Sequence, residues 1–131
     1  RPWMMIRMTD KISENGIAVL DITVIDQMTL DLGHDATKEF LEMFQTYVPE
    51  ALSGIQAAVA TRNIGGVVHF SHDLKNSAAT MGLMRLSCLC RHIETAADDG
   101  KLDEAAELAN ELPLTMAEAL EALTTINAKG T

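Results

Sequence analysis

Apolar residues recur at steps of three and four along most of the chain, which is the spacing of an amphipathic α-helix. The first long series, over 35–61, contains Phe40, Leu41, Phe44, Val48, Leu52, Ile55 and Val59. The second, over 63–81, contains Ile64, Val67, Ser71, Leu74, Ala78 and Met81. The third, over 83–97, contains Leu83, Leu86, Cys90, Ile93 and Ala97, and the last, over 102–126, contains Ala105, Leu108, Leu112, Met116, Leu120 and Leu123. Four long helices are predicted.

Short segments separate these helices and predict how they connect. Gly82 can end the second helix in a left-handed cap, and Asp98-Asp99-Gly100 interrupts the pattern before the last one. Brief connections favour antiparallel neighbours, and Pro49 and Pro113 are expected to kink their helices. A shorter helix over 23–32, with a capping-box-like Thr23-x-x-Asp26, precedes the others. The fold class is therefore all-α, an antiparallel four-helix bundle with a short additional N-terminal helix.

Length and composition favour one domain. The 131 residues are 47% hydrophobic, which suffices for one core. Residues 1–20 lack clear periodicity and are interpreted as a lead-in, a linker or an expression remnant, with the bundle domain over 21–128. The chain begins with Arg1, as expected for a stand-alone protein carrying such a remnant or for a domain cut from a longer chain. No run is long enough to span a membrane and no signal-peptide core is present, so we expect a cytoplasmic protein.

Charge and motif content disfavour several functions. The formal net charge of -9 disfavours nucleic acid and anionic membranes as partners. The sequence contains no GxSxG elbow, so it does not indicate a serine hydrolase. Neither His69, His72 and Asp73 nor Cys88 with His92 completes a zinc ligand set, and no CxxC or HExxH spacing occurs, so no metal site is predicted.

His72 is the first candidate for chemistry. At roughly 100° per residue, it lies roughly 140° from the apolar seam of its helix and should face solvent. Lys75, Asn76 and Ala79 lie within roughly 60° of it, and His69 borders the same strip one turn earlier. A neutral imidazole with an ordinary pKa near 6.5 is a good nucleophile. Phosphoryl transfer asks of its acceptor mainly position, access and a nearby positive charge.

The segment "SHDLKNSAATMGLMRLSCLCRHIE" resembles the signature of histidine-containing phosphotransfer (HPt) domains of bacterial phosphorelays. The positions that match it are His72, Leu74, Lys75, Ser77, Ala78, Gly82, Leu86, Leu89, Cys90 and Glu94. A weaker likeness extends over about 21–126. One departure is Asn76, where the family most often has glycine; its amide could hydrogen-bond a phosphoryl oxygen.

The resemblance implies a phosphocarrier rather than an enzyme. His72 would accept a phosphoryl group from a receiver-domain aspartate and pass it to another receiver, with Lys75 as electrostatic support. Asn76, Ala79 and His69 would form the phosphate and partner surface. The receiver would supply Mg²⁺, so no cofactor is expected on this chain, whose parent could be a hybrid histidine kinase. A positive island of Lys75, Arg85 and Arg91 could complement the receiver's acidic site.

Two alternatives remain to be weighed. The chain could instead be a non-catalytic interaction or dimerisation module of a sensor kinase, but no ATP-binding domain with Gly-rich boxes accompanies it. His69 could replace His72 as the acceptor. However, only His72 has Lys75 and Asn76 at i+3 and i+4, whereas His69 has His72 and Asp73 there, and Asp73 would repel a phosphate. The phosphocarrier with His72 as acceptor is the favoured prediction.

Overall fold

The computed structural model describes residues 17–129, with side chains described to residue 126. Within this range the chain forms six helices: α2 (Ile22–Leu32), α3 (His34–Ala60), α4 (Ile64–Thr80), α5 (Met84–Asp98), α6 (Leu102–Ala109) and α7 (Leu112–Lys129). The lead-in predicted over 1–20 lies, for residues 1–16, outside the described range.

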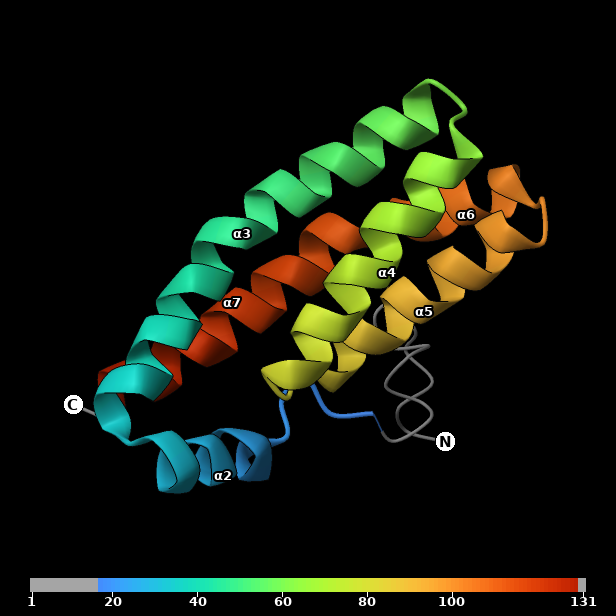
Figure 1. Ribbon diagram of the computed structural model, residues 1–131. Helices are drawn as coiled ribbons and strands as arrows, with labels where there is room; N and C mark the ends of the chain where they lie inside the picture. The colour runs from blue at the N-terminus through green and yellow to red at the C-terminus, as the bar shows by residue number, and fades with distance from the viewer. Residues whose placement is uncertain (1–16, 130–131) are drawn as a thin grey trace.

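The long helices lie side by side, and α2 lies across one end of the bundle (Figure 1). α4 packs against both α3 and α5, and α7 packs against α3 and α5. α4 and α5 are joined by a tight turn and run antiparallel, as the short connection predicts (Figure 1). The all-α bundle with a short N-terminal helix is therefore confirmed.

The last predicted helix is in fact two helices, and the prediction of one helix kinked at Pro113 was wrong. α6 ends at Ala109 and α7 begins at Leu112, with Asn110 and Glu111 in the turn between them. Pro113 is the second residue of α7, where the missing N–H has no helical partner to lose and the fixed φ suits a helix start. The proline therefore helps to begin a helix instead of bending one.

The start of α2 also differs from the prediction. The helix begins at Ile22, and its cap is Asp21, whose carboxylate accepts a hydrogen bond from the Thr23 backbone N–H at 3.1 Å. Asp21 also donates its own backbone N–H to the carbonyl of Gly82 at 2.8 Å. Gly82 has φ +76°, the left-handed conformation expected at the end of α4. The turn between α4 and α5 is thus tied to the start of α2.

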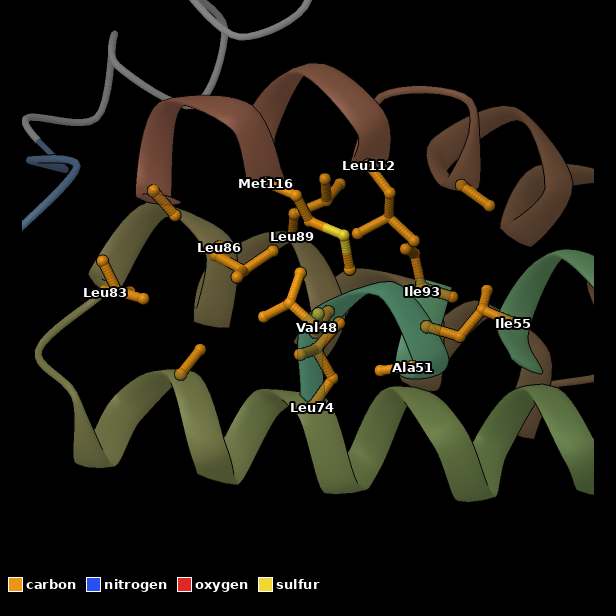
Figure 2. Close-up of a cluster of buried hydrophobic side chains, with 14 of the residues drawn as sticks. Val48, Ala51, Ile55, Leu74, Leu83, Leu86, Leu89, Ile93, Leu112 and Met116 are labelled. Carbon is orange, nitrogen blue, oxygen red and sulfur yellow. The ribbon is translucent and has the colours of Figure 1, made fainter. Parts of the chain in front are cut away.

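The core is a single cluster of side chains from α2 to α7 (Figure 2). The cluster includes Leu74 of α4, Val48 and Ala51 of α3, and Leu86, Leu89 and Ile93 of α5. Cys90 is fully buried, as expected for a core thiol, and burial raises its pKa to about 12. Ser71 is also buried, and its hydroxyl donates to the Val67 carbonyl at 2.6 Å.

Two residues of the predicted apolar series do not reach the core. Phe40 is 42% exposed because its neighbour Leu41 takes the core position, and adjacent residues of a helix point about 100° apart. Ile64, the first residue of α4, is also 42% exposed.

Candidate functional site

The buried face of α4 fixes where His72 points. Val67, Ser71, Leu74 and Ala78 are the buried residues of this helix, and they hold its rotation against α3 and α5. His72 lies on the opposite face, with 49% of its side chain exposed. The predicted exposure of this imidazole on a helix of the bundle is confirmed.

Both ring nitrogens of His72 have partners. Nδ1 lies 2.8 Å from Oε2 of Glu94 on α5, and Nε2 lies 3.2 Å from Nδ2 of Asn76. An ionised carboxylate only accepts hydrogen bonds, so Nδ1 carries the hydrogen and donates it to Glu94. The ring in this arrangement is neutral, with its lone pair on Nε2, which accepts a hydrogen bond from the Asn76 amide.

Lys75 completes the cluster by binding the same carboxylate. Its Nζ lies 2.8 Å from Oε1 of Glu94 and 3.4 Å from Nδ1 of His72. Because Nδ1 already donates to Glu94, the ammonium is a neighbouring charge for the ring and not a donor to it. Both side chains are mostly covered, with 24% of Lys75 and 20% of Glu94 exposed.

The electrostatics of the cluster keep Glu94 ionised. Partial burial alone would raise the pKa of this carboxyl. The hydrogen bonds from Lys75 and His72, together with the positive charge of Lys75, outweigh the burial and lower the pKa of Glu94 below its ordinary value. Glu94 is therefore a carboxylate at neutral pH and a steady acceptor for Nδ1.

The structure brings three of the five predicted site residues into contact and leaves two at the border. His72, Lys75 and Asn76 form the cluster. Ala79 is exposed on the same face of α4, one turn beyond Asn76. His69 forms no hydrogen bond or ion pair with these three residues; its Nε2 pairs with Oδ2 of Asp73 at 3.4 Å.

Glu94 belongs to the matched signature, but the sequence prediction gave it no role. The antiparallel pairing of α4 and α5 could have pointed to it. Around the turn at Gly82, His72 lies ten residues before and Glu94 twelve residues after, so the two fall at about the same level of the helical hairpin. Finding Glu94 from the sequence therefore requires the alignment of α4 with α5 across the turn, and the spacing of residues along α4 alone does not give it.

The predicted positive island is not present as such. Arg85 points away from solvent, with 15% of its side chain exposed, and its Nη1 lies 3.5 Å from Oε1 of Glu118. Lys75 is paired with the Glu94 carboxylate. Arg91 is the member of the trio that remains on the surface without a recorded carboxylate partner among the described residues.

A groove adjoins this face of α4. Its lining comes from α3 and α4 and consists of Phe40, Met43, Phe44, Tyr47, Ser77, Thr80 and Met81. Met43 and Phe40 of this lining are exposed apolar side chains, with 65% and 42% of their surface accessible. Ser77 and Thr80, the α4 residues of this lining, lie five and eight residues after His72.

The described part of the chain has neither a cluster of metal ligands nor a membrane-spanning helix. Within residues 17–126, His, Cys, Asp and Glu side chains nowhere gather in groups of three or more that could hold a metal ion. Among the described helices, none combines the length and apolarity needed to cross a membrane.

Comparison with known proteins defines the class of this chain. The family model of the Hpt domain matches residues 39–125, which contain the whole His72 cluster. The chain belongs to this family. It is therefore a histidine phosphotransfer domain of phosphorelays, a phosphocarrier that interacts with receiver domains. The alternative of a non-catalytic dimerisation module is not favoured.

Solved structures with the same fold support the assignment of the bundle. Histidine-containing phosphotransfer protein B from Pseudomonas aeruginosa PAO1 has a TM-score of 0.80 at 22% identity, covering 85% of this chain and 96% of the other. The histidine-containing phosphotransfer domain of ArcB from Escherichia coli gives 0.74 at 24%, covering 91% and 98%. The HPT domain of a sensor hybrid histidine kinase from Shewanella gives 0.71 at 18%, covering 85% and 95%. No curated protein matches the chain significantly.

Proposed function

We propose that His72 is the residue on which this Hpt domain carries the phosphoryl group. It would accept the group from the aspartyl phosphate of one receiver domain and pass it to the aspartate of another. One observation carries the proposal: the half-exposed ring has its Nδ1 fixed on Glu94 at 2.8 Å, which leaves Nε2 as the basic nitrogen. A nucleophile whose lone pair has a fixed direction needs little further help in phosphoryl transfer.

No proton moves during the transfer step. The Nε2 lone pair attacks phosphorus, the bond from phosphorus to the aspartate oxygen breaks, and the aspartate leaves as a carboxylate. The hydrogen on Nδ1 stays there and continues to donate to Glu94. The phosphorylated ring then carries a positive charge that the Glu94 carboxylate stabilises, and the reverse step with a second receiver restores the neutral ring. Glu94 acts as a positioning residue in both directions.

Lys75 supports the reaction by its charge. A bare carboxylate beside His72 would repel an incoming phosphoryl group, and the ammonium bound to Glu94 at 2.8 Å offsets that repulsion. Ala79 leaves room for the receiver because its side chain is small, and His69 borders the same surface from the other side.

The receiver partner would dock over α4 and the adjoining groove. The apolar residues Phe40 and Met43 offer contact area beside the acceptor, and Glu39, Glu42 and Glu50 of α3 line the adjacent surface. These features favour a receiver whose docking face combines apolar and basic residues. The proposal also includes Mg²⁺ on the receiver and no cofactor on this chain, a cytoplasmic setting, and a hybrid histidine kinase as a possible source of the domain.

The test is phosphoryl transfer from a phosphorylated receiver domain to variants of the two neighbouring histidines. We expect His72→Gln to abolish acid-labile labelling. His69→Gln is the matched control, because it removes an exposed imidazole one turn away, and it should retain most of the labelling. Circular dichroism checks that each variant is folded, and mass spectrometry of the labelled protein maps the phosphate. Labelling that survives in His72→Gln and disappears in His69→Gln would overturn the assignment.

A further inference from the structure

Asn76 lies directly on the nitrogen that has to react. Its Nδ2 is 3.2 Å from Nε2 of His72, one turn earlier on α4, and its side chain is exposed. The related signature most often has glycine at this position, which offers no side chain to the ring.

The chemistry of the ring fixes the direction of this hydrogen bond. Nδ1 donates to Glu94, so Nε2 of the neutral ring can only accept. Of the two ends of the Asn76 amide, only the NH₂ group can donate to it. The donated hydrogen points at the same lone pair that would attack phosphorus.

We propose that Asn76 is a positioning residue that caps Nε2 of His72 in the resting state and must release it before phosphoryl transfer. This inference rests on the proposed role of His72 as the acceptor. An exposed hydrogen bond of this kind changes an equilibrium by roughly twofold to tenfold. The cap thus sets how often the nucleophile is free, and the glycine of the related signature would leave it free at all times.

The test uses phosphoramidate, a small phosphoryl donor, so that receiver docking does not enter the measurement. In this reaction the Nε2 lone pair attacks phosphorus, the bond from phosphorus to the protonated nitrogen of the donor breaks, and that nitrogen leaves as ammonia with its proton. Phosphorylation of His72 is followed by ³¹P NMR in the wild type, Asn76→Ala and Asn76→Gly. Gly65→Ala serves as the matched control for Asn76→Ala: it too raises helix propensity on the exposed side of α4, and its new Cβ would meet only Asn63 Oδ1, at an ordinary 3.7 Å.

We expect both Asn76 variants to be phosphorylated roughly twofold to tenfold faster than the wild type, and Gly65→Ala to match the wild type. A second readout needs no phosphate. The ¹⁵N resonance of His72 Nε2 should move toward the value of a nitrogen with a free lone pair in the Asn76 variants, while Nδ1 stays unchanged.

Two results would overturn the cap. An unchanged Nε2 resonance in Asn76→Ala would mean that the amide does not hold this nitrogen. Slower phosphorylation of both Asn76 variants would mean that the amide assists the phosphoryl group instead of masking its acceptor. If His72 of the wild type takes no phosphate from any donor, the proposed function fails, and the Nε2 resonance still decides whether the cap exists.

Discussion

At the scale of single residues, the site depends on one carboxylate that serves two partners. Glu94 accepts from His72 through one oxygen and from Lys75 through the other. Without it, Nδ1 would have no fixed acceptor and the hydrogen of the ring could move to Nε2, the nitrogen that has to react. The contacts of Glu94 with His72 and Lys75 thus both connect α5 to α4 and select the tautomer of the His72 ring.

We expect Glu94→Gln to lower the free energy of unfolding by about 1 kcal/mol at pH 6, because a partly buried ion pair and a charged hydrogen bond are lost. The folded pKa of Glu94 lies below its ordinary value near 4.3. The carboxylate therefore contributes stability above that value and loses it as pH falls through the lower folded pKa. Urea unfolding of both proteins at pH 6 and pH 3 checks this. A difference between them that grows toward pH 3 would contradict the expectation.

At the scale of elements, the turn between α4 and α5 positions the pair His72 and Glu94, and Gly82 makes that turn possible. Its φ of +76° suits glycine, and a Cβ there would lie 2.7 Å from the Asp21 carbonyl oxygen and 2.9 Å from Val24 Cβ. The backbone carbonyl of Gly82 also accepts the hydrogen bond that the Asp21 backbone N–H donates. Gly82 thus ends α4, sets the register of the α4–α5 hairpin and ties the start of α2 to this turn.

Gly82→Ala should lower the free energy of unfolding by about 2–3 kcal/mol, from the left-handed backbone and the contact with Asp21 together. Gly100→Ala is the matched control, because Gly100 has φ +78° and nothing within 4 Å of its would-be Cβ. It should lose about 1 kcal/mol from the backbone alone. Chemical denaturation of the two variants gives the comparison, and equal losses would show that the contact with Asp21 carries no cost.

The elements also show what the sequence could predict. Periodicity placed α3, α4 and α5 to within about a residue at most ends, because their apolar positions report directly which face is buried. The break at Asn110 and Glu111 was missed because the apolar series continues across it with little change of phase. The role of Glu94 was missed because it depends on the register of two helices, which is a tertiary property.

At the scale of the whole molecule, the exposed His72 cluster lies on the solvent-facing side of α4. The groove lined by Phe40 and Thr80 shares Met43 and Tyr47 with a second, acidic surface hollow that includes Glu39, Glu42 and Glu50. A formal net charge of -9 acts over the whole surface, so an acidic partner face would be repelled. Apolar contact area with an acidic border is therefore the surface that we propose for receiver docking.

The last prediction separates docking from chemistry. Phe40→Ala combined with Met43→Ala should slow phosphoryl transfer from a receiver domain by about tenfold, because exposed apolar anchors beside a reactive centre contribute to binding. Phosphorylation by phosphoramidate should stay at the wild-type rate, since neither residue contacts the His72 cluster. Leu114→Ala is the control: Leu114 is 53% exposed but lies on α7, outside this groove, and its loss should leave both rates unchanged. Equal slowing with both donors would place the effect on His72 itself, and an unchanged receiver rate would place the docking surface elsewhere.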